Sequence, residues 1–479
     1  MNGSENAPLW ALTACELGSG YTAGAFSPLG VLDSVMARFD AVNPLINAVV
    51  TVDRDGAHAA AAASTARHRA GKPLSRLDGV PITVKDNIAV KGMRATWGSR
   101  LYADHVPAAD ELAVARLRMA GAVILGKTNC PEFTLQGYTD NTLFGATRNP
   151  YDLALTPGGS SGGAVAAVAA GIGPIAIATD GGGSIRRPAS HTGLIGLKPS
   201  RGRVPRDGGF PPILFDLETV GPIARAVDDV ALIMGLIASP DARDPASRGF
   251  VPFAAEPRLA RRILYVPRFG DAPVDEEIAA HVDAAANCFA DLGHSVEQQT
   301  APFDVSAIAA AWPVISQGGL SWLGTRLTGF GEKASVAIRD MAAAGRAFSA
   351  ADYVDALLVI RDLERRLAAV FERYDLILTP SAAALPWPAT DPFPTTIAGR
   401  SVGGRGHAVF TAFVNMAGLA GINLPCGSSR NGLPIGLQLV APVGGDGLLV
   451  SMADECEAAA LWSPVRPQCI PGLRAAVAM

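Results

Sequence analysis

The sequence is poor in lysine. Only six of its 40 basic residues are Lys, and the other 34 are Arg. When Arg supplies nearly all positive charge, a retained Lys can offer something that Arg cannot, above all an amine able to lose its proton when buried. Lys85, Lys127 and Lys198 lie in strings of suggestive composition, whereas the remaining three lysines are expected at the surface.

Paired cysteines are also missing. No Cys-x-x-Cys string occurs, so neither a disulfide framework nor a zinc site is indicated. We therefore expect buried free thiols in a reducing cytoplasm. The six cysteines are Cys15, Cys130, Cys288, Cys426, Cys456 and Cys469.

Charge is scarce as well. Charged residues make up 18% of the chain, hydrophobic residues 49%, and the net charge is −4. This is the reverse of a disordered composition, and it gives no reason to expect nucleic acid or an anionic membrane as a partner. The start, MNGSENAPLW, lacks the basic and apolar parts of a secretion signal, so a cytoplasmic enzyme with a large interior is expected.

No uncharged run has the character of a membrane span. The longest, residues 153–179, is rich in Ala and Gly in its second half and is interrupted by Gly171, Gly173 and Pro174. This composition predicts a helix followed by a buried strand.

Short apolar runs alternate with longer helical patterns along most of the chain. This alternation predicts an α/β fold in which helices cover both faces of a central mixed sheet. The expected strands are 46–53, 81–84, 122–125, 174–178, 262–266 and 376–380, and the expected helices include 109–120, 163–171, 226–238, 275–292 and 350–374.

The helix expected at 350–374 has the clearest signals. Ser349 and Asp352 form a capping pattern at its start. Its predicted buried stripe consists of Tyr353, Leu357, Ile360, Leu367, Val370 and Tyr374. The Pro-rich and Gly-rich segments 380–394 and 399–406 that follow are expected to be long loops.

Two strings imitate well-known motifs. GAVILGKT (121–128) satisfies the P-loop pattern and would make Lys127 a nucleotide ligand, but its variable positions form an apolar strand and Pro131 follows closely. GGSSG (158–162) satisfies the nucleophile-elbow pattern and would make Ser160 an α/β-hydrolase nucleophile. That fold needs a catalytic His, and none of the available histidines has a distinctive setting: His191, His281, His294 and His407.

Three further strings together carry the parts of an acyl-transfer site. PITVKDNI (81–88) places Lys85 at the end of an apolar strand, where burial favours the neutral amine. TPGGSSGG (156–163) and ATDGGGSIRRPAS (178–190) each set Ser among glycines, whose backbone N–H groups can converge on one point. The three strings supply a base, a relay hydroxyl, a nucleophile and an oxyanion cradle.

The region from about Leu77 to Val204 resembles the amidase signature family, hydrolases with a Ser-cisSer-Lys triad. The matching strings occur in the family's order, and a later one resembles its C-terminal strand. They are GVPITVKDNI, GAVILGKTNCPEF, FGATRNPYD, TPGGSSGG, ATDGGGSIRRPA, GLIGLKPSRGRV and, at 432–442, GLPIGLQLVAP. The resemblance implies one amidase domain over 1–479, with its signature core at about 77–204 and a more variable, substrate-shaping region at about 250–348.

Carried over to this sequence, the resemblance implies that Ser184 is the nucleophile, Ser160 the bridging serine after a cis peptide bond, and Lys85 the base. It also implies a set of neighbouring residues with backbone or supporting roles. These are Gly181, Gly182, Gly183 and Ser184 for the oxyanion hole, and Ser161, Asp180 and Arg186 as supporting residues. Aromatic walls are expected from Trp312, Trp322, Trp387 and Phe393.

The function so implied is hydrolysis of a carboxamide C–N bond through a Ser acyl-enzyme, releasing ammonia or an amine and a carboxylate, with esterase side activity. No cofactor or metal is expected, and the partners are a small amide substrate and at most a second copy of the chain. One alternative is the glutaminase subunit of an aminoacyl-tRNA amidotransferase, ranked lower because no string resembles its glutamine-binding C-terminal half. Another is an ATP-dependent enzyme that uses GAVILGKT.

Overall fold

The computed structural model describes residues 7–462 and residue 470, so Cys469 lies outside the described residues. Its strands are β1 (Val49–Val52), β2 (Pro81–Lys85), β3 (Val123–Thr128), β4 (Ile175–Asp180), β5 (Ile195–Lys198), β6 (Thr219–Ala224), β7 (Arg262–Tyr265), β8 (Ser295–Gln298), β9 (Leu376–Pro380), β10 (Thr396–Ile397), β11 (Arg400–Ser401), β12 (Ala420–Ser428) and β13 (Pro434–Ala441). Its α-helices are α1 (Ala14–Ala23), α2 (Pro28–Ile46), α3 (Arg54–Arg69), α4 (Leu112–Met119), α5 (Gly162–Ala170), α6 (Arg186–Ser190), α7 (Val227–Ile237), α8 (Glu276–Asp291), α9 (Val305–Gly324), α10 (Phe330–Lys333), α11 (Val336–Gly345), α12 (Ala350–Arg373), α13 (Ala412–Met416) and α14 (Asp446–Ala458).

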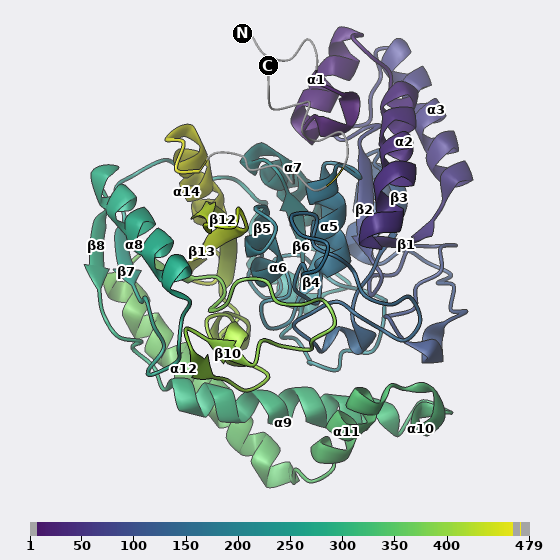
Figure 1. Ribbon diagram of the computed structural model, residues 1–479. Coiled ribbons are helices and arrows are strands. Elements are labelled where there is room, and N and C mark those ends of the chain that lie inside the picture. The colour runs from purple at the N-terminus through teal and green to yellow at the C-terminus, as the bar shows by residue number, and fades with distance from the viewer. Residues whose placement is uncertain (1–6, 463–469, 471–479) are drawn as a thin grey trace.

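A mixed sheet forms the centre of a single large domain (Figure 1). Eleven of the described strands pair in the order β1-β3-β2-β4-β6-β5-β12-β13-β9-β7-β8. β2 runs parallel to both β3 and β4, whereas β4 runs antiparallel to β6. Each of the six strands expected from the sequence is present, and the predicted α/β fold with a mixed sheet is confirmed.

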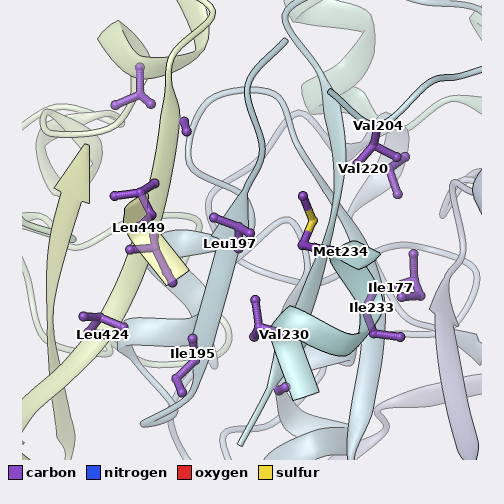
Figure 2. Close-up of a cluster of buried hydrophobic side chains, with 14 of the residues drawn as sticks. Ile177, Ile195, Leu197, Val204, Val220, Val230, Ile233, Met234, Leu424 and Leu449 are labelled. Atoms are coloured by element: carbon purple, nitrogen blue, oxygen red, sulfur yellow. The ribbon is translucent and has the colours of Figure 1, made fainter. Parts of the chain in front are cut away.

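Helices pack on both faces of this sheet because side chains alternate along each strand. Ala176 and Ala178 of β4 cluster with apolar residues of α5 and α6. Ile177, which points the other way, belongs to the large cluster that includes α7. Figure 2 shows part of this cluster, in which Ile233 of α7 and Leu449 of α14 lie near side chains of the strands.

A group of helices lies along one side of the molecule, away from α1–α3 (Figure 1). In this group α9 packs against α11 and α12, and it also contacts α13. It belongs to the segment 250–348, and its residue Trp312 is buried. This placement brings Trp312 to the same cavity as Gly181 and Gly182, which follow β4.

The capping box predicted for α12 is present, with Ser349 and Asp352 bonding each other's backbone N–H groups. The predicted buried stripe is partly wrong, since Leu357 is 45% exposed. The buried positions are Ala356, Ile360, Leu363 and Leu367. The apolar periodicity predicted the helix correctly but assigned Leu357 instead of Ala356 to its buried face. Ala356 was missed because its small side chain gives a weak apolar signal.

The run 153–179 forms α5 followed by β4, as predicted. Among the described residues, no helix is both long enough and apolar enough to cross a membrane. The described cysteines are free thiols: Cys15, Cys130, Cys288, Cys426 and Cys456.

Candidate active site

The candidate site begins where two parallel strands end side by side. Lys85 is the last residue of β2, and Asp180 is the last residue of the neighbouring strand β4. Parallel strands present their carboxyl ends at the same edge of a sheet. The sequence strings that contain Lys85 and Ser184 are therefore brought to one place by strand pairing.

The Lys85 amine is fully buried and has three oxygen partners. Nζ lies 2.8 Å from Ser160 Oγ, 3.0 Å from Thr179 Oγ1 and 3.4 Å from the Thr179 carbonyl oxygen. Burial lowers the pKa of Lys85 to about 8. A neutral amine has two hydrogens and one lone pair, so donation to the two Thr179 oxygens directs the lone pair toward Ser160.

Two consecutive serines connect Lys85 to the turn that carries Ser184. The Gly159–Ser160 peptide bond is cis, as the family resemblance predicted. Ser161 N–H donates to the Ser184 carbonyl oxygen at 3.2 Å, and Ser161 Oγ donates to the Thr179 carbonyl oxygen at 3.2 Å. Ser161 thereby ties the end of β4, the start of α5 and Ser184 together.

Ser184 lies in the turn between β4 and α6 and lines a cavity of about 320 Å³. Its side chain is nearly buried, and Ser184 Oγ makes no hydrogen bond to any residue in the described part of the chain. The structure thus joins Lys85 to Ser160 directly and places Ser184 beside them through Ser161. The Ser184 hydroxyl remains available to a molecule in the cavity.

A buried ion pair holds the glycine turn in shape. Asp180 accepts hydrogen bonds from Arg186 Nε at 3.0 Å and Nη2 at 2.9 Å. Burial alone would raise the pKa of Asp180, but the Arg186 guanidinium outweighs burial and holds this pKa well below its usual range. Arg186 also donates to Gln438 Oε1 and to Asn415 Oδ1, each at 2.6 Å. The turn is therefore anchored to β13 and α13.

The backbone amides of the glycine turn at 181–184 differ in whether they are already hydrogen-bonded. Gly183 N–H donates to Asp180 Oδ1 at 2.6 Å, so this amide is already bonded. The amides of Gly181, Gly182 and Ser184 donate to none of the described residues. Of the four amides that the resemblance implies for the oxyanion hole, three are therefore free of hydrogen bonds to the described residues.

Asp180→Asn is expected to lower the free energy of unfolding by about 3 to 5 kcal/mol, because the buried Arg186 charge loses its partner. Urea denaturation measures this change. Asp40→Asn is the matched control, since it breaks the Arg54–Asp40 pair, which lies at the surface, and it should cost about 1 kcal/mol or less. Equal stability of the two variants would show that the buried pair does not hold the turn.

Several cavity residues were not singled out by the sequence. Arg187, Arg405 and His407 line the cavity with Ser184. Arg187 stands in the SIRRPA string next to Arg186, which was a usable signal. Arg405 belongs to the Gly-rich segment 399–406 and His407 follows it, and no local pattern marks either residue.

The predicted aromatic walls are confirmed in part. Trp312 and Phe393 line the cavity. Trp387 is buried and packs against the His407 ring instead, with centroids 4.7 Å apart. Trp322 is 41% exposed.

The two imitated motifs gain no support from the structure. Lys127 lies within β3, fully buried, and its amine donates to the Ile88 carbonyl oxygen, so it cannot reach a nucleotide. Ser160 is bonded to Lys85, and no described His contacts it. A nucleophile elbow would need such a His as its base.

Comparisons with known proteins show the family of this chain. The family model Amidase matches residues 30–450. A glutamyl-tRNA(Gln) amidotransferase subunit of Symbiobacterium thermophilum is 36% identical, over 92% of this chain and 95% of that protein. An acylamidase of Rhodococcus erythropolis is 34% identical, over 95% of this chain and 97% of that protein. The crystal structure of a bacterial aryl acylamidase of the amidase signature family superposes with a TM-score of 0.88 at 31% identity, covering 95% of this chain and 98% of that one. The chain therefore belongs to the amidase signature family of hydrolases.

Proposed function

We propose that this enzyme is an amidase that hydrolyses a small carboxamide through an acyl-enzyme on Ser184. The contact that carries the proposal is the 2.8 Å hydrogen bond between Lys85 Nζ and Ser160 Oγ, buried beside the cavity that Ser184 lines. A base with a pKa of about 8, a relay hydroxyl and a Ser184 hydroxyl that bonds to no described residue are the parts that acyl transfer needs.

The proposed reaction begins when neutral Lys85 takes the proton of Ser160 while Ser160 takes the proton of Ser184. Ser184 Oγ then attacks the amide carbon, and the oxyanion is held by the free backbone amides of the glycine turn. Loss of one such donor costs on the order of 3 kcal/mol. The proton returns through Ser160 to the leaving nitrogen, the C–N bond breaks, and water releases the carboxylate by the reverse relay.

Gly181, Gly182 and Ser184 are the donors that we propose for the oxyanion, since Gly183 is bonded to Asp180. Thr179 is a positioning residue, because its two oxygens orient the Lys85 amine. The segment 250–348 shapes the substrate site through Trp312 and Ala337, which line the cavity.

A second candidate is the glutaminase subunit of an aminoacyl-tRNA amidotransferase, which the 36% identity to one such protein favours. Glutamine would bring an ammonium group into the cavity. Among the described lining residues only Glu218 is a carboxylate, and it is paired with Arg206 at 2.9 Å. Because Glu218 shares the Arg206 guanidinium with Glu111, this pairing does not exclude an ammonium group. We rank the stand-alone amidase first because no string of the sequence resembles the glutamine-binding C-terminal half of that subunit.

A substrate panel tests the proposed function. It contains aliphatic amides, an acetanilide, the matching methyl esters and glutamine, each assayed for ammonia, amine or alcohol release by the chain alone. For a stand-alone amidase we expect turnover of at least one amide other than glutamine. Turnover of glutamine alone would support the glutaminase candidate, and no turnover of any amide or ester would contradict both.

The activity is expected to rise with pH. Because the neutral form of Lys85 is the base, kcat/KM for an uncharged amide should increase about tenfold per pH unit below pH 8 and level off above it. Initial rates between pH 5.5 and 9.5 measure this profile. Aliquots held at each pH and then assayed at pH 8 control for inactivation. A rate that falls as pH rises from 6 to 8 would contradict a neutral Lys85.

A further inference from the structure

Two guanidinium groups line the cavity beside Ser184 and have no carboxylate partner in the part of the chain that the structure describes. Arg187 is only 4% exposed. Its Nη1 donates to the Gly182 carbonyl oxygen and, at 2.7 Å, to Thr411 Oγ1, whereas Nε is buried and bonds to none of the described residues. Neither Arg187 nor Arg405 forms an ion pair with a carboxylate in the described residues.

Arg405 is the second cation. It is exposed, lines the same cavity, and its guanidinium stacks 4.5 Å from the centre of the Trp312 ring. Burial, and next the positive charge of Arg405, lower the pKa of Arg187 to about 9. The two positive charges are therefore close enough to repel each other, and the stacking on Trp312 holds Arg405 there.

The other polar lining residues do not fully neutralise this charge. Glu218 is the one carboxylate among the described lining residues, and it shares the Arg206 guanidinium with Glu111 at 2.9 and 2.7 Å. These three groups carry one net negative charge, against the two positive charges of Arg187 and Arg405. Both ring nitrogens of His407 are buried and have no hydrogen-bond partner among residues 7–462 and 470. Burial and then the Arg187 charge hold the pKa of His407 well below the usual value. A neutral His407 adds one hydrogen-bond donor and one acceptor but no negative charge.

A buried charge without a counter-charge is costly, and an anion bound in the cavity removes that cost. Guanidinium groups bind carboxylates with directed, charge-assisted hydrogen bonds. Resting on the proposed amide hydrolysis, we propose that the substrate carries a carboxylate, which Arg187 and Arg405 bind in the cavity beside Ser184. The apolar walls, including Leu214, Trp312 and Phe393, suit a short apolar link between this carboxylate and the amide.

The carboxylate can belong to the acyl half or to the amine half of the amide substrate. Two pairs of substrates, each with a charged member and a neutral isostere, distinguish these possibilities. Succinamate and its neutral isostere 4-methylpentanamide test the acyl half. N-acetylglycine and N-isobutylacetamide test the amine half. We expect kcat/KM of the charged member to exceed that of its isostere by about tenfold or more in one of the two pairs.

Arg405→Gln is expected to reduce kcat/KM of the favoured charged substrate about tenfold more than that of its neutral isostere. Arg430→Gln, which removes an exposed guanidinium outside the cavity, should change neither. Faster hydrolysis of the neutral member in both pairs, or an equal effect of Arg405→Gln on both members, would overturn the proposal.

Binding of succinate, measured by calorimetry with Ser184→Ala, tests the anion site without turnover. We expect binding to weaken about tenfold when Arg405→Gln is added. If succinate binds in this way but no amide is hydrolysed, the anion site stands and the proposed function fails. If neutral amides are hydrolysed and succinate does not bind, the proposed function stands and the anion site is wrong.

Discussion

Ser184→Ala is expected to lower kcat for amide hydrolysis by at least about 10⁴-fold. The change removes the one hydroxyl that lines the cavity from the glycine turn, and no other described serine lines it. Because Ser184 Oγ bonds to no described residue, its loss breaks no internal contact. The free energy of unfolding should therefore stay within about 1 kcal/mol of the parent value.

Steady-state kinetics and urea denaturation together check this result. Ser451→Ala is the matched control, because Ser451 is also buried but lies on α14, outside the cavity. It should keep its activity. A Ser184→Ala enzyme that retains more than about a tenth of the parent kcat would show that another group makes the attack.

The second large effect is expected at Lys85. Lys85→Arg should lower kcat by about 10³-fold, since guanidinium stays protonated and cannot accept the Ser160 proton. Lys85→Met keeps a similar length without the amine and should lose a comparable factor. Arg keeps the positive charge without a neutral base, and Met has neither. A loss in both variants would therefore show that a base, and not only a positive charge, is required.

Thermal denaturation of both Lys85 variants shows whether they fold, because Lys85 is completely buried. Lys91→Arg is the control for the same substitution at an exposed position and should be fully active. If Lys85→Met kept activity within tenfold of the parent, Lys85 would not be the base. If Lys85→Arg alone kept it, a positive charge rather than a neutral amine would be required.

The few lysines in the sequence were a better guide to the candidate active site than any helix pattern. Lys85, Lys127 and Lys198 are fully buried, while Lys72, Lys91 and Lys333 are exposed. Burial of an amine is tolerable when it can shed its proton, and burial lowers the pKa of Lys198 to about 7. A lysine within an apolar string was thus a signal of burial. Among the described residues, Lys85 is the one lysine that contacts a serine hydroxyl.

The central strands could be predicted because strings such as PITVK and IAIATD are rich in apolar residues and fully buried. The hydrogen bonds of individual backbone amides in the glycine turn could not be predicted. The pairing of Gly183 with Asp180 follows from the local shape of the turn, which the spacing of glycines does not determine. The sequence therefore identified the turn but not the bond that Gly183 N–H makes to Asp180.

The cavity lining was the least predictable part. Arg405 and His407 come from a loop more than 200 residues after Ser184 and reach the site only through the packing of the C-terminal half. No local periodicity or motif connects such a loop to the glycine turn. The same long-range closure brings Thr411 and Asn415 to Arg187 and Arg186.

Mass spectrometry of the trapped acyl-enzyme tests the central claim most directly. The enzyme is mixed with a slowly deacylating activated ester, quenched in acid within seconds, digested and sequenced by tandem mass spectrometry. We predict one added acyl group on Ser184, and none in Ser184→Ala. An acyl group on Ser160 or on Cys130 in the parent enzyme, with Ser184 unmodified, would contradict this assignment.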